Sequence, residues 1–145
     1  MEQEWSQILN DTKSYSEVAV QDLELCCDLD TFMSTFVEND AEYSLQKFME
    51  NNGDQDIQVS EWKEGDGGHS KTRIIEYTHP VDAPMAPPMA RARKEQSFRR
   101  FGDHGLVFET KTYVSDVPMT DCFYVADLVR VETKQSEDGG TRLLM

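Results

Sequence analysis

A chain of 145 residues and 16.6 kDa is long enough for one domain with a sizeable core, and its seven Phe, five Tyr and two Trp argue against wholesale disorder. Its formal net charge of −14 disfavours binding to nucleic acid. It has no apolar run of the roughly 18 residues that a membrane span needs, and no basic start with an apolar core typical of a signal peptide, so we expect a soluble, cytoplasmic chain.

The N-terminal part of the chain predicts little regular structure. Residues 1–16 show no sustained period around an isolated Trp5, so we expect a flexible lead-in followed by one domain at residues 17–145. A weak alternation of apolar residues over Val18–Cys26 then predicts an edge strand.

Two short helices are predicted next. The first is amphipathic and begins after Asp28 or Asp30, because either carboxylate can cap its first turn. Its apolar stripe at helical spacing consists of Leu29, Phe32, Met33 and Phe36. The second helix covers Tyr43–Glu50 and ends at Asn51-Asn52-Gly53, and the residues expected on its inner side are Leu45, Phe48 and Met49.

The rest of the chain alternates as an antiparallel sheet does. The predicted strands are one opened by Ile57, Val59 and Trp62, then Ser70–Thr78, Ala90–Phe101, Leu106–Val114, a long strand through Phe123 and Val131, and the start of another at Thr141–Met145. Helices followed by sequentially paired strands predict an α+β fold with a curved antiparallel sheet and helices on one face. Its C-terminal end is incomplete, because no later helix covers the concave face. Either the sequence is a fragment or a partner covers the sheet.

A proline-rich apolar segment, Tyr77–Met89, interrupts this sheet. It holds four of the five prolines, each of which fixes φ and lacks an N–H, so we predict a loop that is neither helix nor central strand. A stiff apolar loop loses little entropy on contact, which suits it to close over an apolar ligand or to press on a membrane. The alternative is a loop that packs on the core.

Six segments, in this order, resemble one family. They are Asp30–Val37 (DTFMSTFV), Ile57–Trp62 (IQVSEW), Arg73–Tyr77 (RIIEY), Pro80–Pro87 (PVDAPMAP), Glu95-Gln96 and Asp116–Phe123 (DVPMTDCF). Their combination resembles the VASt domain, the StAR-like lipid-transfer module of GRAM-domain proteins such as the Aster and Lam sterol transporters. The resemblance covers about residues 18–145.

This resemblance implies a helix-grip fold, in which a bent antiparallel sheet and a long C-terminal helix enclose a cavity for one sterol. It also implies non-vesicular sterol movement at endoplasmic reticulum contact sites, with GRAM and transmembrane segments elsewhere in a longer parent chain. The loop at residues 81–89 corresponds to the loop that gates the pocket in the family. The final strand and the C-terminal helix of the family have no counterpart in this sequence.

The candidate ligand-binding residues fall into two groups. The loop group is Val81, Ala83, Pro84, Met85, Ala86 and Pro87, and the aromatic group is Trp62, Tyr77, Phe98, Phe108, Tyr113 and Phe123. Each aromatic residue fits ordinary core as well as pocket lining, because both are built from the same residue types. Beside the loop, Met89, Arg91 and Arg93 are predicted to face phospholipid headgroups, and the alternative is a solvated strand face.

The sequence shows no catalytic constellation and no metal site. Its three histidines lie apart in turns, its three cysteines lack metal-binding spacing and fit a reducing setting, and it has neither a GxSxG motif nor a glycine-rich phosphate loop. We therefore expect no enzyme activity and no cofactor, and we expect a sterol or another lipid, with transient membrane contact, as the partner. The competing interpretation is a module of the same fold that does not transport lipid and instead docks a protein partner.

Overall fold

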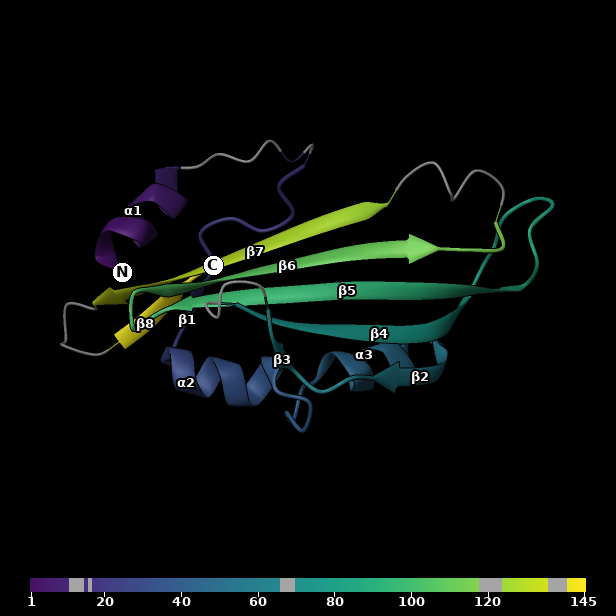
Figure 1. Ribbon diagram of the computed structural model, residues 1–145, viewed down its shortest axis with the longest axis horizontal. Helices are drawn as coiled ribbons and strands as arrows, with labels where there is room; N and C mark the ends of the chain where they lie inside the picture. Colours follow the sequence, from purple (N-terminus) through teal and green to yellow (C-terminus); the bar gives the residue numbers. More distant parts are fainter. Residues whose placement is uncertain (11–14, 16, 66–69, 118–123, 136–140) are drawn as a thin grey trace.

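The computed structural model describes residues 1–10, 15, 17–65, 70–117, 124–135 and 141–145 (Figure 1). Its helices are α1 (Glu2–Asn10), α2 (Leu29–Phe32), the π-helix η1 (Met33–Val37) and α3 (Leu45–Asn51). Its strands are β1 (Glu24–Leu25), β2 (Gln55–Val59), β3 (Lys63–Glu64), β4 (Lys71–Pro80), β5 (Met89–Phe101), β6 (Gly105–Val114), β7 (Val125–Gln135) and β8 (Thr141–Leu144).

The described strands form one antiparallel sheet. It has eight strands in the order β1-β8-β7-β6-β5-β4-β2, and β3 also pairs with β4. The long strands β4 to β7 follow one another in sequence and in space, whereas β1 pairs with β8 and so brings Glu24 and Leu25 beside the C-terminal strand. Short helices beside a sequentially paired sheet confirm the predicted α+β class.

The inner face of the sheet is the one against which α2, η1 and α3 lie (Figure 1). On β4, Arg73, Ile75 and Tyr77 point to this face and are buried, whereas Ile74 on the outer face is exposed, because successive side chains of a strand point to opposite faces. One core cluster joins α2 and η1 to the sheet through Leu29, Val37, Phe98, Leu106, Val131 and Leu143. A second cluster joins α3 to the sheet through Met49, Ile75, Tyr77 and Ala92.

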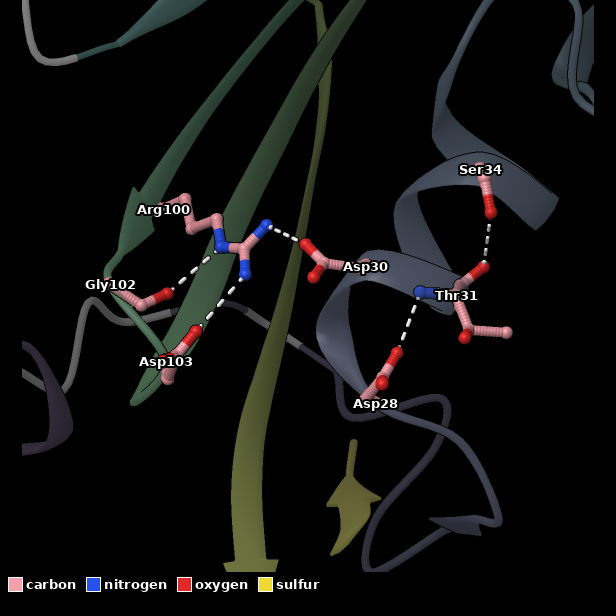
Figure 2. Close-up of polar contacts among 7 residues, drawn as sticks. All are labelled: Asp28, Asp30, Thr31, Ser34, Arg100, Gly102 and Asp103. Carbon is pink, nitrogen blue, oxygen red and sulfur yellow. Dashed lines mark hydrogen bonds and ion pairs between the residues drawn. The ribbon is translucent and has the colours of Figure 1, made fainter.

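The predicted start of the first helix is confirmed at Asp28, whose side chain accepts a hydrogen bond from the backbone N–H of Thr31 over 2.8 Å (Figure 2). This bond lowers the pKa of the Asp28 carboxyl. Asp30 has another role: its Oδ1 lies 2.6 Å from Nη1 of Arg100, at the end of β5. The ion pair with Asp30 raises the pKa of Arg100 and ties α2 to the β5–β6 turn.

The sequence prediction is wrong for most of residues 1–16, because Glu2–Asn10 forms α1. This helix lies against the outer face, where Trp5 is buried with its ring centroid 5.2 Å from that of Phe101. Arg99 on the same face pairs with Glu4 over 2.9 Å. Nothing near Trp5 in the sequence signals these contacts, because both partners come from β5.

The predicted stripe of the first helix is wrong at its last member. Residues Met33–Val37 form a π-helix, in which the N–H of Glu38 bonds to the carbonyl of Met33 over 3.0 Å, five residues back. Because a π turn takes up more residues than an α turn, the buried position moves on to Val37. Phe36, which was expected to face the core, is 41% exposed.

The second helix is shorter than predicted at its start, since it begins at Leu45 with Ser44 as its N-cap. Met49 is buried as expected, but Phe48 is exposed and the prediction that it faces inward is wrong. The predicted stop is confirmed at Gly53, whose φ of 92° is the left-handed conformation that glycine adopts without strain.

Two strand predictions also need correction. The edge strand expected over Val18–Cys26 is reduced to the two residues of β1. The loop predicted from Tyr77 is shorter, because β4 continues to Pro80 and pairs with β5 as far as Met89. A proline is tolerated there because β2 pairs with β4 only up to Thr78, which leaves Pro80 with a neighbour on one side.

Candidate functional site

The proline-rich loop spans residues 81–88 and joins β4 to β5 at the end of the sheet away from α1 (Figure 1). It closes with a hydrogen bond from the N–H of Val81 to the carbonyl of Pro88 over 2.9 Å. The Met85 side chain at its tip is 97% exposed, and its φ of 63° is strained for a residue other than glycine. The loop therefore presents its apolar tip to solvent and does not lie flat on the core. Of the predicted loop residues, Ala83, Pro84 and Pro87 are also exposed, and Val81 and Ala86 are half-buried.

Three of the predicted aromatic residues lie together beneath α2 and η1. Trp62 meets Phe98 edge-on with ring centroids 4.8 Å apart, and Phe108 stacks parallel to Phe98 at 6.4 Å. All three contact the core cluster that contains Leu29 and Val37. They fill the space between these helices and the sheet in this structure.

Tyr77 lies at a different place on the inner face, in the cluster beneath α3. Burial, with a smaller contribution from the nearby Asp54 carboxylate, raises the pKa of Tyr77 to about 12. The ammonium group of Lys94 lies 5.7 Å from the centroid of its ring, and burial lowers the pKa of Lys94. Tyr77 is thus a neutral aromatic group with a cation over its face.

The predicted residues Tyr113, Arg91 and Arg93 lie on the outer face. Arg93 lies over the Tyr113 ring at 5.3 Å, and its guanidinium pairs with Glu95 over 2.7 Å. Arg91 is 82% exposed at its side chain and is 3.7 Å from Asp116. Met89 is half-buried at the start of β5, and Phe123 lies outside the described residues.

An open groove of about 970 Å³ surrounds this part of the outer face. Its lining residues are Asp56, Gln58, Glu76, Tyr77, Thr78, Arg91, Ala92, Arg93, Tyr113, Val114, Ser115, Asp116, Val117 and Tyr124. Carboxylates and guanidinium groups both line it, and no residue of the loop at 81–88 does. The groove is therefore polar and separate from the apolar loop.

Sequence analysis missed a buried arginine on the inner face. Arg73 is 5% exposed, and its guanidinium lies 4.4 Å from the Trp62 ring centroid. Its Nε donates to Oε1 of Gln96 over 2.8 Å, and its Nη1 donates to Oδ1 of Asn39 over 2.6 Å and to the carbonyl of Val37 over 3.3 Å. Burial lowers the pKa of Arg73 to about 10, and no carboxylate in the described part of the chain pairs with it. Its place in the alternation, on the face of Ile75 and Tyr77, was the available signal.

The hydrogen bonds of this arginine continue across the sheet. Gln96 Nε2 donates to Oγ1 of Thr110 over 3.0 Å, and in the next row Lys94 Nζ donates to Oγ1 of Thr112 over 2.9 Å. Both hydroxyl groups thus accept a hydrogen bond, while no acceptor among the described residues takes the proton of either. Two donors are left on the inner face of β6.

The inner face is only partly covered beside these hydroxyl groups. Val125 of β7, which pairs with Thr112 of β6, is 53% exposed, and Val114 and Val129 are half-buried. Asp127, between Val125 and Val129 on the same face, pairs with Thr110 of β6 and is also exposed. Val114 and Val129 pack against the two core clusters, so the open part of this strip over β6 and β7 is at Val125 and Asp127. The strip combines valine surface and one carboxylate with two hydrogen-bond donors.

Within the described residues, His, Cys, Asp and Glu side chains do not gather into a group that could hold a metal ion. None of the helices in the described ranges is both long enough and apolar enough to cross a bilayer.

Comparison with known proteins gives one family and several distant relatives. The profile of the family described as VAD1 Analog of StAR-related lipid transfer domain (VASt) matches residues 19–145. The chain is 29% identical over 98 residues to Protein VASCULAR ASSOCIATED DEATH 1, chloroplastic, of Arabidopsis thaliana, which covers 67% of this chain and 16% of that protein.

Two animal proteins are similar to the same degree. Protein Aster-A of Homo sapiens is 30% identical over 84 residues, which is 57% of this chain and 12% of that protein. Protein Aster-B of Mus musculus is 31% identical over 97 residues, or 63% of this chain and 13% of that protein. The chain thus spans less than a fifth of each of these relatives. The α+β sheet with short helices agrees with the helix-grip fold expected from the sequence, and the family match extends over most of its length, so the chain belongs to the VASt family.

Proposed function

We propose that residues 17–145 bind a sterol or a similar lipid on the inner face of the sheet and carry it between membranes without covalent chemistry. The family to which the chain belongs is described as a lipid-transfer domain, which supports this class of function. The expected cellular location, at endoplasmic reticulum contact sites as part of a longer membrane-anchored protein, stays a prediction.

The observation that carries this proposal is the open strip over β6 and β7. A sterol has one hydroxyl group and a large apolar body, and a site for it needs a few polar groups in mostly apolar surroundings. The hydroxyl protons of Thr110 and Thr112 supply donors for the ligand oxygen, while Val114, Val125 and Val129 supply apolar surface. The exposed Asp127 carboxylate on the same face disfavours an anionic ligand. Burial of that surface by the ligand is favourable by about 25 cal/mol per Å².

The charges behind these threonines strengthen the donors. Each threonine accepts a hydrogen bond from a group that is itself a cation or is bonded to one, namely Lys94 for Thr112 and, through Gln96, Arg73 for Thr110. A hydroxyl group that accepts such a bond becomes a better donor, because hydrogen bonds in a chain polarise one another. An uncharged lipid with an acceptor oxygen is the ligand that these groups suit.

The loop at residues 81–89 is the proposed gate and membrane contact. Its exposed Met85 can enter a bilayer surface, and its prolines limit the entropy lost on contact. Arg91, the exposed basic residue near its base, is the proposed contact to phospholipid headgroups, with Arg93 and Met89 beside it. The pocket-lining roles of Trp62, Phe98 and Phe108 require these rings to move aside for the ligand, and they remain predictions.

The test measures transfer of dehydroergosterol between vesicles by the full chain. Fluorescence energy transfer to a labelled acceptor vesicle reports the arrival of the sterol. We expect saturable binding of the sterol, and we expect Met85→Asp to slow transfer about tenfold because a charge at the tip opposes contact with the apolar bilayer. The matched control is Asp82→Ala, an exposed residue of the same loop that contributes no apolar surface. Absence of saturable binding, or equal transfer rates for both variants, would refute the proposal.

A further inference from the structure

Two exposed aromatic side chains, one from η1 and one from the segment after it, meet on the surface. Phe36 is 41% exposed and Tyr43 is 64% exposed, and their ring centroids lie 6.2 Å apart. Phe32, which is half-buried, lies 5.2 Å from Phe36 and supports it from below. Single exposed aromatic residues are common on protein surfaces, but two in contact form a local apolar patch.

The backbone holds this pair in place. The π turn of η1 puts Val37 in the core and leaves Phe36 outside. Such turns are rare in proteins, and those that occur are often found at functional sites. The N–H of Tyr43 bonds to the carbonyl of Thr35 over 3.0 Å, and Asn39 between them is fixed by Arg73 and by the carbonyl of Ser60. A partner that binds here orders little chain in doing so, which favours binding.

Three acidic residues lie between Phe36 and Tyr43 in the sequence. Glu38, Asp40 and Glu42 are exposed, and none of them has an ion pair or side-chain hydrogen bond within the described ranges of the chain. Nζ of the nearby Lys47 donates to the backbone carbonyls of Ala41 and Glu42, so its single positive charge offsets only part of the three negative ones. The patch therefore combines two exposed rings with a net negative charge.

We propose that this surface, the η1 patch (Phe36, Glu38, Asp40, Glu42 and Tyr43), docks a basic amphipathic segment of a partner protein. Apolar side chains of such a segment would cover the two rings, and its Lys or Arg residues would pair with the three carboxylates. A guanidinium or ammonium group can also stack on an exposed ring. Aromatic anchors inside a charged rim are the usual arrangement of a specific protein interface.

The negative charge of the patch favours a basic protein segment over a lipid bilayer as the occupant. An anionic bilayer would be repelled by three unpaired carboxylates in a chain with a net charge of −14, whereas a basic segment is attracted and steered to them. The η1 patch shares no residue with the strip over β6 and β7, so the proposed partner and the proposed lipid contact different side chains.

The experiment measures binding of a labelled amphipathic peptide of leucine and lysine to the full chain by fluorescence anisotropy. We expect saturable binding that weakens with added salt, and no binding of the counterpart peptide with glutamate in place of lysine. Tyr43→Ser, which changes a mostly exposed side chain, should weaken binding about tenfold. Tyr124→Ser on the outer face is the matched control and should leave binding unchanged, since Tyr124 is half exposed and distant from η1.

Charge reversal separates the patch from the general acidity of the chain. The triple variant Glu38→Lys, Asp40→Lys and Glu42→Lys should abolish peptide binding. The triple variant at other exposed positions, Glu17→Lys, Glu64→Lys and Asp82→Lys, should reduce binding by much less. Equal losses from the two triple variants would overturn the proposal, as would unchanged binding by Tyr43→Ser. Anionic vesicles are the second probe, and vesicle binding that requires Phe36 and Tyr43 would also overturn it in favour of a membrane surface.

Discussion

Lys94 Nζ donates a hydrogen bond to Thr112 Oγ1 over 2.9 Å on the inner face of the sheet, which leaves the Thr112 proton free to meet a ligand. Thr112→Val keeps the shape of the side chain but removes this donor. We expect the affinity for cholesterol to fall about tenfold and the affinity for cholestane, which has no oxygen, to stay the same. Competition against dehydroergosterol measures both, and an equal change for the two ligands would show that Thr112 does not bind the hydroxyl group.

Thr133→Val, the same substitution at a threonine of β7, should stabilise the protein. The hydroxyl oxygen of Thr133 is buried and has no hydrogen-bond partner within the described residues, so it pays a desolvation penalty without a bond. Replacing it with a methyl group should raise the free energy of unfolding by about 1 kcal/mol. Urea denaturation measures the change, and a loss of stability would mean that this hydroxyl group has a partner in solution.

Gly105→Ala should destabilise the protein. A Cβ atom at this position would lie against the Trp5 ring and only 2.6 Å from the carbonyl oxygen of Val131, so either α1 or the sheet would have to move. We expect a loss of about 1–3 kcal/mol in urea denaturation, as for other overpacked sites. Combining the change with Trp5→Ala should cost less than the sum of the two single changes, because the ring is then absent. Additive losses would argue that α1 does not rest on Gly105.

Tyr77 should make the protein sensitive to alkali. Its pKa is raised from its ordinary value of 10 to about 12 in the folded state, so the neutral form is favoured by folding. This contribution is fully present below about pH 10 and is lost as the pH rises toward about 12, where the unfolded chain has already released the proton. Between pH 10 and pH 12 the free energy of unfolding of the unsubstituted protein should fall by roughly 2 kcal/mol relative to that of Tyr77→Phe.

Comparing the unsubstituted protein with Tyr77→Phe removes the contribution of the other groups that titrate at high pH. Burial lowers the pKa values of Arg73 and Lys94, so both groups act in the opposite sense, and both are present in each protein. Urea denaturation at several pH values gives the difference in unfolding free energy. A constant difference across the window would contradict the raised pKa of Tyr77.

Local patterns in the sequence determined the sheet and its faces. Alternation placed Arg73, Ile75 and Tyr77 on one side of β4, because a strand has a period of two whatever it contacts. The capping position of Asp28 and the stop at Gly53 were also local, since they depend on a side-chain oxygen near the first N–H groups and on a residue free to adopt positive φ. Two of the segments that carried the family resemblance, Arg73–Tyr77 and Glu95-Gln96, lie on β4 and β5.

Tertiary contacts decided what the residues in those elements do. Trp5 is buried because Phe101 and Gly105, far along the chain, form its site, and Val37 of η1 is buried because it packs with Phe98, Leu106 and Val131 of the sheet. The sequence pattern of an aromatic strand residue is the same whether it lies in the core or lines a pocket. Only the packing of α2 on the sheet showed that Phe98 is covered. The sequence determined which side chains share a face, because that depends on neighbouring backbone; the structure decided which part of the face stays open, because that depends on elements distant in the chain.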